Sequence, residues 1–362
     1  MAVNAVPKVS VLVPVYNVGR YVGSCLESLL AQDLAGVEVI VVNDGSTDDS
    51  RDVISRVCAN DDRVRVIDKE NSGYGASLNR ALDEARGQFI GILESDDELV
   101  DGALALLLSE ALRLGADVVK GDFLYWWSED EARTVRAHEI SSDMCGALVD
   151  TTEDLRIYSR KSTIWSAVYR TAFLREHGIR FLETPGAAFQ DTSFNFKVFA
   201  SCHKAAFVDA PVIRYRQDNE GSSVHSKDKA DAVGVEFDEI DRWLVENAEP
   251  QCLDRLLQVS LVQRFNAYLW NLDRLDEPAR LAFLCDIGSQ YEDYEREGRL
   301  RVDDWDGWRL ANLRALQRDP YRYLRLRGTL RSGTKLGKAR FALALGGPFV
   351  LLSAVREQSG RR

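Results

Sequence analysis

The chain has 362 residues, enough to bury a full-sized core and to hold two or three domains. Hydrophobic residues make up 45% of it and charged residues 28%, as in ordinary globular proteins, and Pro or Gly dominates no stretch. The six cysteines occur singly, without a CxxC pair or zinc spacing, which predicts reduced thiols in a cytosol. The first residues alternate like a strand up to Pro14 and lack the basic and apolar regions of a signal peptide.

The formal net charge of −11 is unevenly distributed along the chain. Residues 318–362 contain eleven Lys or Arg against two acids, a net of +9, so residues 1–317 carry −20. The acidic body would repel nucleic acid, and no basic stretch is interleaved with aromatic residues, so we expect no nucleic-acid partner. A basic tail on an acidic body requires a local explanation.

The N-terminal third alternates short apolar runs with helical periodicity. Strands are expected at Val9–Val15, Val37–Asn43, Val64–Asp68, Phe89–Leu93 and Ala116–Phe123. Helices are expected between them, around residues 22–30, 48–57, 76–85 and 102–114. Continuous apolar strands separated by single helices predict an α/β fold, a mostly parallel sheet covered by helices on both faces.

Polar clusters follow three of these strands directly. They are Asn43-Asp44, Asp68-Lys69 and Glu94-Ser95-Asp96-Asp97. Ligands of such sheets bind beyond the carboxyl ends of the strands, so the three clusters are expected to meet at one binding edge.

The rest of the chain changes character twice. Residues 124–230 are irregular and rich in aromatic side chains, and a helical pattern begins near Ala230. We therefore predict a catalytic domain at 1–230, a helical domain at 231–317 and a basic, apolar tail at 318–362.

The tail contains a 15-residue apolar run, Phe341–Val355, broken by Gly346, Gly347 and Pro348. This run is too short and too interrupted for a typical transmembrane helix. Eight basic residues lie between Arg318 and Arg340, just before it, which favours an interfacial segment on an anionic membrane. The alternative is a basic C-terminal helix that closes the core, and the sequence leaves both open.

The acidic cluster after the fourth strand suggests a cation. Carboxylates crowded together repel one another unless a cation lies among them, and hard oxygen ligands in an open site suit Mg²⁺ or Mn²⁺. The alternative is a solvated loop in which Asp97 and Glu98 complement the dipole of the helix that begins near Gly102.

Four segments resemble a known family. In chain order they are VSVLVPVYNVGRYVGSCLESLLAQ, VEVIVVNDGSTDDS, NSGYGASLNRALDEARGQFIGILESDD and QDTSFNFKVF. Their order and spacing over roughly residues 8–230 resemble the family 2 glycosyltransferases, inverting enzymes of the GT-A fold that use nucleotide-diphospho-sugars. The resemblance implies a Rossmann-like, mostly parallel sheet flanked by helices, with a C-terminal helical extension.

The resemblance also implies a donor site. The loop Pro14-Val15-Tyr16-Asn17 would lie against the base and ribose, and Asp44 would bind the uracil imide or the ribose. Asn71 and Gly73 precede a helix whose positive end would face phosphate, and Asn79 lies one turn into that helix. These residues have structural alternatives: strand termination for Pro14, a helix N-cap for Asp44 and a tight turn for Asn71–Gly75.

Glu94-Ser95-Asp96 occupies the family's DxD position, so Asp96 is the expected ligand of Mn²⁺ or Mg²⁺. Glu94 stands where the family usually has Asp and would contact the ribose or, through water, the metal. The segment YRQDNEGSSVHS resembles a later loop of these enzymes and makes Arg216 and His225 candidate diphosphate or metal contacts.

The family places an Asp as general base at the start of a helix, which here is Asp191 in FQDTSF. Gln190 stands where Glu is common. The alternative role for Asp191 is an N-cap of the helix that begins TSFNFKVF.

The implied function is inverting transfer of a sugar from a UDP-linked donor to a glycan or lipid-linked acceptor in cell-surface polysaccharide biosynthesis. The enzyme would work in the cytoplasm or on the inner face of the plasma membrane, with residues 318–355 contacting lipid. A dehydrogenase is disfavoured because VYNVGRYVG lacks the glycine spacing that a dinucleotide requires. The other alternative is a nucleotide-sugar-binding scaffold that has lost turnover, given the departures at Glu94 and Gln190.

Overall fold

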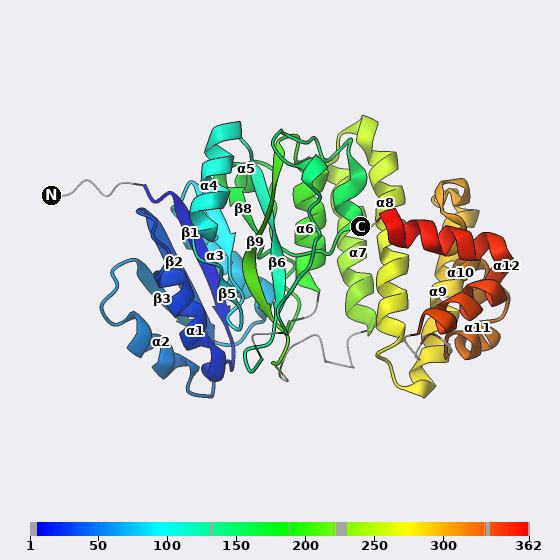
Figure 1. Cartoon of the computed structure of the whole chain (residues 1–362), viewed down its shortest axis with the longest axis horizontal. Coiled ribbons are helices and arrows are strands. Elements are labelled where there is room, and N and C mark those ends of the chain that lie inside the picture. Colours follow the sequence, from blue (N-terminus) through cyan, green and yellow to red (C-terminus); the bar gives the residue numbers. More distant parts are fainter. Residues whose placement is uncertain are drawn as a thin grey trace. The chain divides into compact units, whose positions relative to one another are not determined.

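The computed structural model describes residues 6–130, 133–187, 189–219, 221, 230–328, 330 and 334–360. The chain divides into two compact units (Figure 1). The first comprises Met1–His225 and Arg242–Ala248, and the second comprises Ser226–Asp241 and Glu249–Arg362.

A nine-stranded sheet forms the centre of the described part of the first unit. Its strands are β1 (Val9–Val15), β2 (Val37–Asp44), β3 (Val64–Lys69), β4 (Phe89–Ile92), β5 (Glu98–Leu99), β6 (Val118–Trp126), β7 (Val135–Arg136), β8 (Ala167–Arg170) and β9 (Ala205–Arg216). They lie in the order β3-β2-β1-β4-β8-β6-β9-β5, and β7 pairs with β6.

The first four strands of that order are parallel, with Val9 opposite both Val37 and Phe89. β8 is antiparallel to β4 and β6, whereas β6 and β9 run parallel. Every residue of β1 and β2 is buried, as expected for parallel strands with helices on both faces. The carboxyl ends of β1, β2, β3 and β4 therefore share one edge of the sheet.

Helices cover both faces of this sheet. They are α1 (Gly19–Leu30), α2 (Ser50–Cys58), α3 (Tyr74–Glu84), α4 (Ala103–Leu114), α5 (Thr171–Glu176) and α6 (Gln190–Ser201). Short 3₁₀ helices occur at η2 (Ser142–Met144) and η3 (Leu155–Ser159).

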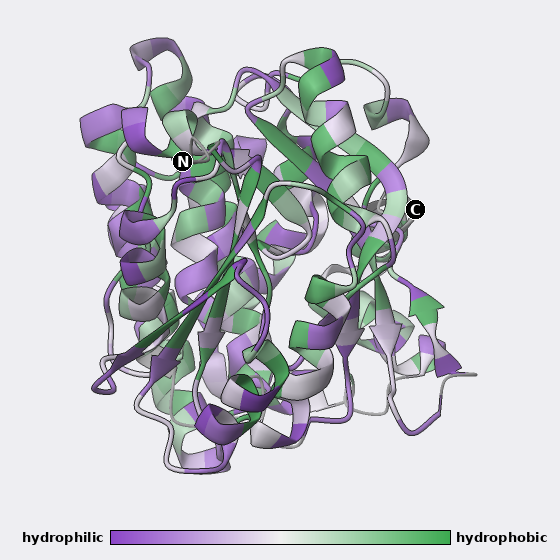
Figure 2. Cartoon of the chain, turned by 90° about the vertical axis from the view of Figure 1, so that its left-hand side faces the viewer, coloured by the Kyte–Doolittle hydropathy of each residue, from purple (hydrophilic) through white to green (hydrophobic). Residues whose placement is uncertain are grey.

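A large hydrophobic core lies between one face of the sheet and its helices. Val9, Val11 and Val13 of β1 belong to a cluster that includes buried residues of α1, α2 and α4. α3 lies outside that cluster and packs on β1 and β2. Hydrophobic and hydrophilic residues both occur along the helices beside the sheet (Figure 2). In α1, α2 and α3 they lie on different sides of the helix, which is the amphipathic pattern expected of helices that cover a sheet.

The second unit is helical in its described residues. Its helices are the first part of α7 (Ala230–Asn247), α8 (Pro250–Leu272), α9 (Glu277–Arg296), η5 (Val302–Asp304), α10 (Gly307–Arg318), α11 (Pro320–Arg327) and α12 (Lys335–Gly360). The Arg264 side chain is fully buried and lies 2.9 Å from Asp238 and 3.1 Å from Asp241, so the core of this unit contains a compensated charge.

α12 carries the apolar run of the tail. Over Lys335–Val355 it is long and apolar enough to cross a membrane, as buried core helices and signal sequences also are. Only 17% of the residues in its most apolar stretch are buried inside the protein. Gly346 and Gly347 have non-helical backbone angles and Pro348 follows them, so α12 is kinked where the sequence predicted a break.

Gly75, in the first turn of α3, lets the backbone of Leu182 approach closely, and we expect this contact to be essential for stability. A Cβ added there would lie 2.1 Å from the carbonyl oxygen of Leu182, so Gly75→Ala should lower the free energy of unfolding by roughly 1–3 kcal/mol. Urea unfolding followed by circular dichroism measures this change.

The matched control is Gly23→Ala in α1, where the new Cβ would meet only Val53, at 3.4 Å. This change should be neutral or stabilise by up to about 1 kcal/mol, because alanine favours a helix. Equal unfolding midpoints for the two variants would contradict the close approach at Gly75.

Candidate active site

The acidic segment after β4 turns sharply at the sheet edge. The amide of Asp97 donates to the carbonyl of Glu94 at 3.0 Å, so this segment is a turn and not an extended strand. Because of the turn, Glu94 and Asp96 have different partners. Glu94 accepts a hydrogen bond from the Tyr74 hydroxyl, and Oδ2 of Asp96 accepts one from Nδ2 of Asn219 at 2.7 Å.

The electrostatics of Glu94 reflect its crowded surroundings. Desolvation raises its pKa to about 8, and the charges of Asp96 and Asp191 act in the same direction. The hydrogen bond from Tyr74 opposes the rise. A cation bound nearby would lower this pKa and favour the ionised form of Glu94.

Asp97 and Glu98 make contacts other than those of the helix-capping role considered for them. Asp97 is fully buried, and its Oδ1 accepts a hydrogen bond from the backbone amide of Arg216 at 2.8 Å. Glu98 belongs to β5 and lies 3.6 Å from Arg214 and 3.4 Å from Arg216 of β9. Both acids therefore join the acidic segment to β9.

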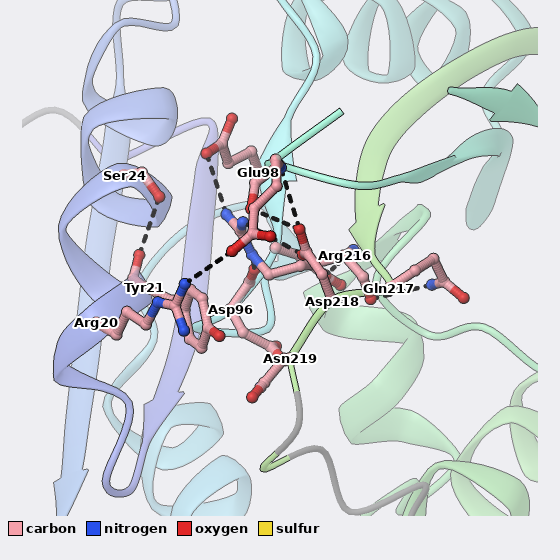
Figure 3. Close-up of polar contacts among 12 residues, drawn as sticks. Arg20, Tyr21, Ser24, Asp96, Glu98, Arg216, Gln217, Asp218 and Asn219 are labelled. Atoms are coloured by element: carbon pink, nitrogen blue, oxygen red, sulfur yellow. Dashed lines mark hydrogen bonds and ion pairs between the residues drawn. The ribbon is translucent and has the colours of Figure 1, made fainter. Parts of the chain in front are cut away.

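Arg216 lies beside Asp96 and Glu98 of this segment (Figure 3) and is buried. Its side chain is 3% exposed, and its Nε donates to the backbone carbonyl of Asp96 at 2.6 Å. Its guanidinium carbon lies 4.3 Å from the ring centre of Trp126 and 4.8 Å from that of Tyr21. The side chain expected to reach a diphosphate is thus occupied by protein contacts.

The loop after β1 is tied to the loop after β2. Pro14 and Val15 are the last residues of β1, and Tyr16 is 50% exposed. Asn17 has φ of 52°, and its Oδ1 accepts a hydrogen bond from the amide of Thr47 at 2.8 Å. The structure thus places an exposed aromatic ring at the carboxyl edge of the sheet.

Asp44 fixes the loop before α3. Its carboxylate accepts hydrogen bonds from the amides of Ser72 at 3.0 Å and Gly73 at 2.9 Å, and it pairs with Lys69. It does not cap α2, whose N-cap is Asp49. Asp44, Asn71 and Gly73 are thus brought together, and Asn71 is exposed.

Asn79 is buried and braces a different segment. Its Nδ2 donates to the carbonyl of Phe181 at 2.9 Å and to Glu183 at 2.8 Å, and its Oδ1 accepts from the amide of Phe181 at 3.0 Å. Asn79 therefore joins α3 to the chain that leads toward Asp191.

Asp191 is the second residue of α6, whose N-cap is Phe189. Desolvation raises its pKa to about 6, while backbone N–H groups at the start of the helix and the charge of Lys161 oppose the rise. Gln190 is buried and donates to the Thr184 hydroxyl at 2.8 Å. Asp191 is therefore not the N-cap of α6, because it lies inside the first turn of the helix.

Three residues that the sequence did not single out complete the site. Tyr74 contacts Glu94, Asn219 contacts Asp96, and Nζ of Lys161 lies 4.4 Å from the ring centre of Tyr215. Tyr74 lies within the NSGYG segment, so its neighbourhood was recognisable. Lys161 lies in an irregular region with no motif and could not be found from the sequence.

The candidate metal contacts are Asp96, Glu94 and His225. Among the described residues, no group of three or more His, Cys, Asp or Glu side chains is arranged to hold a metal ion. His225, a predicted metal contact, lies outside the described residues. Asp96 is near enough to Glu94 for its charge to raise the pKa of Glu94.

The sheet order, the acidic turn after β4 and the carboxylate at the start of α6 describe an α/β protein with carboxylates at the carboxyl edge of its parallel strands. Residues 10–197 match the family described as Glycosyl transferase family 2. This match covers more than half of the chain, which therefore belongs to that family, as its motifs predicted.

Related proteins agree with this assignment. The chain is 30% identical over 215 residues to the uncharacterized glycosyltransferase EpsJ of Bacillus subtilis, covering 59% of this chain and 62% of EpsJ. It is 31% identical over 216 residues to the putative glycosyltransferase EpsH of the same organism, covering 58% and 61%. The alignments thus span about six tenths of these relatives' lengths. A hyaluronan synthase of Pasteurella multocida is 41% identical over 111 residues, covering 31% of this chain and 11% of the synthase.

Solved structures confirm the fold. S. aureus TarS 1–349 in complex with UDP-GlcNAc superposes with a TM-score of 0.69 at 21% identity, covering 90% of this chain and 92% of that TarS fragment. A mannosyltransferase from Pyrobaculum calidifontis, PcManGT, in complex with GDP-Man and Mn²⁺ has a TM-score of 0.51 at 15% identity, covering 97% and 87%. The predicted GT-A fold, a mostly parallel sheet flanked by helices with a helical C-terminal region, is confirmed.

The pKa of Asp191 should depend on Lys161. In the folded protein the pKa of Asp191 is raised from 3.8 to about 6, and the Lys161 charge holds it below the value that desolvation alone would give. Lys161→Met should therefore raise this pKa further, and Lys161→Arg should leave it close to wild type. Carbon-13 NMR titration of the Asp191 carboxyl measures it. An unchanged pKa in Lys161→Met would show that the two groups do not interact.

Proposed function

We propose that this protein transfers a sugar, with inversion, from a nucleotide-diphosphate donor to a hydroxyl of a glycan or lipid-linked acceptor. We assign the catalytic part to residues 1–230, followed by a helical domain at 231–317 and the tail at 318–362. The observation that carries the proposal is Asp191, a desolvated carboxyl with a pKa of about 6, within electrostatic reach of Glu94.

Asp191 would act as the general base. Inverting transfer requires a group that removes the acceptor proton while the hydroxyl attacks the anomeric carbon. A base with a pKa of about 6 is largely ionised at pH 7, so it can accept a proton. It is also more basic than an ordinary aspartate, so it binds that proton more strongly. The first turn of α6 and Lys161 stabilise its ionised form.

The donor would bind along the loops at the carboxyl edge of the sheet. The exposed ring of Tyr16 offers a stacking surface for the base, next to Pro14, Val15 and Asn17. Asp44 either turns from its contacts with Ser72 and Gly73 to the base or ribose, or keeps them and shapes the loop that carries Asn71. A UDP donor is supported by the likeness of the fold to TarS, whose structure was solved with UDP-GlcNAc.

The residues around Asp96 fit a divalent cation. Asp96 is partly exposed, and its charge raises the pKa values of Glu94 and Asp97. A cation would relieve this accumulation of negative charge, and carboxylate oxygens suit Mn²⁺ or Mg²⁺. Asp96 would hold the ion, with Glu94 and His225 as the other predicted metal contacts, and the adjacent Ser95 would contact the nucleotide-sugar. Once bound, the ion would stabilise charge on the leaving diphosphate.

Replacing the base should abolish transfer without removing donor binding. Asp191→Asn keeps the size of the side chain but cannot accept the proton, so the rate should fall about 10²–10⁴-fold. UDP release, measured with a panel of nucleotide sugars and acceptors in Mn²⁺, tests this expectation. Asp33→Asn, the same change at an exposed position after α1, is the surface control.

In wild type, the rate should also fall below about pH 6, where Asp191 becomes protonated. Turnover that survives Asp191→Asn unchanged would refute the base assignment. UDP binding by wild type without release from any donor would favour the alternative function, a nucleotide-sugar-binding scaffold. That alternative is supported by the departures at Glu94 and Gln190.

The tail suggests a partner surface. Phe341, Ala342 and Val350 of α12 are buried, whereas a second set of apolar residues is exposed. The exposed set is Leu336, Leu343, Phe349, Leu352 and Val355. With the basic residues before them, they support contact of residues 318–355 with an anionic membrane, on the inner face of the plasma membrane. Work on cell-surface polysaccharide agrees with this placement and with the synthase names among the relatives.

Replacing exposed apolar residues of α12 should weaken membrane contact. The double change Phe349→Ser and Leu352→Ser in the full chain should lower binding to phosphatidylglycerol vesicles in a sedimentation assay, because insertion depends on buried apolar area. Leu112→Ser, at an exposed position of α4, is the control. Equal sedimentation of all three proteins would remove the membrane proposal.

A further inference from the structure

The end of β9 and the residues just after it contact the acidic turn. Arg216 donates from its backbone amide to Asp97 at 2.8 Å and from Nε to the carbonyl of Asp96 at 2.6 Å. Three residues later, Asn219 donates to the Asp96 carboxylate at 2.7 Å (Figure 3). One short stretch of chain therefore contacts the backbone carbonyl of Asp96, its side chain and the carboxylate of the next residue.

These contacts occur where solvent does not compete. Arg216 is 6% exposed as a residue and Asn219 is 8% exposed. The guanidinium lies over Trp126 and Tyr21 and reaches Glu98 at 3.4 Å. A planar group with several fixed donors can hold these partners together, whereas a lysine ammonium cannot stack and donate in the same way.

We propose that Arg216 and Asn219 are positioning residues that set the orientation of the Asp96 carboxylate for the donor's metal ion. The Asn219 amide donates to Oδ2, and no hydrogen bond from the described residues reaches Oδ1, while Arg216 fixes the backbone that carries the side chain. In this assignment Arg216 does not bind the donor diphosphate. The inference rests on the proposed function, because it gives Asp96 the metal.

Groups that orient a metal ligand affect metal affinity strongly. Loss of such an outer contact typically weakens metal binding or activity about 10–100-fold. A cation that touched the diphosphate directly would behave differently. Its charge would contribute to nucleotide binding without metal, and a lysine in its place would retain part of that binding.

The test compares four full-length proteins: wild type, Arg216→Lys, Asn219→Ala and Arg113→Lys. Arg113, an exposed residue of α4 paired with Glu110, is the matched control. Calorimetry measures the affinity for UDP without metal and the affinity of the UDP complex for Mn²⁺. Hydrogen exchange of the amides of residues 97–99, without ligand, measures how firmly the turn is held.

We expect both Arg216→Lys and Asn219→Ala to weaken Mn²⁺ binding about 10–100-fold while metal-free UDP affinity stays at the wild-type value. Exchange at residues 97–99 should be faster in Arg216→Lys and unchanged in Arg113→Lys. Wild-type Mn²⁺ affinity in both variants would overturn the proposal, as would metal-free UDP binding that weakens in Arg216→Lys. Asn219→Ala keeps the proposal testable if Arg216→Lys does not fold.

The two proposals fail in different ways. A wild-type protein that binds neither UDP nor Mn²⁺ contradicts the proposed function and the metal role of Asp96. If exchange in the turn is still faster in Arg216→Lys, Arg216 positions the turn and only its assigned purpose is overturned. Unchanged exchange with intact ligand binding contradicts the positioning role and leaves the proposed function in place.

Discussion

Repulsion among carboxyl groups at the end of β4 is the constraint on which the site depends. Glu94, Asp96 and Asp97 lie within one turn, and Asp191 acts on Glu94 from α6. Desolvation strengthens each of these interactions and raises the pKa values of the most buried members. The surrounding chain compensates locally through hydrogen bonds and positive charges. The result is a site with concentrated negative charge that is suited to a bound cation.

The residues that surround this acidic turn also fix the loops. Asp44 holds the amides before α3, and Asn79 holds the segment before α6. Gln190 braces the same segment through Thr184. Several residues that motif reasoning assigned to the donor therefore have a supporting role within the protein itself. These supporting contacts hold a carboxylate at a defined place on an edge of the sheet that is built from loops.

Much of the fold could be predicted, because buried strands and amphipathic helices depend on local periodicity. The strand starting at Val9 and the helix through Cys25 and Leu29 are examples, and parallel pairing followed from single-helix connections. The contacts of Arg216 with Asp96 could not be predicted, since they join residues 120 apart in the sequence. Lys161 also depends on tertiary packing, in a region without periodicity. Local pattern indicated the edge of the site but not its partners.

The two departures from the family pattern can be understood through the same electrostatics. Glu94 is one methylene longer than Asp, and in the structure it reaches the hydroxyl of Tyr74. Gln190 is buried beside Asp191 and is neutral. A glutamate there would place a second carboxyl next to Asp191, the proposed base, and raise its pKa further, because like charges disfavour ionisation. With glutamine, desolvation raises that pKa to about 6, while backbone N–H groups and the charge of Lys161 oppose the rise. The substitution therefore alters the charge around the proposed base without removing its carboxyl group.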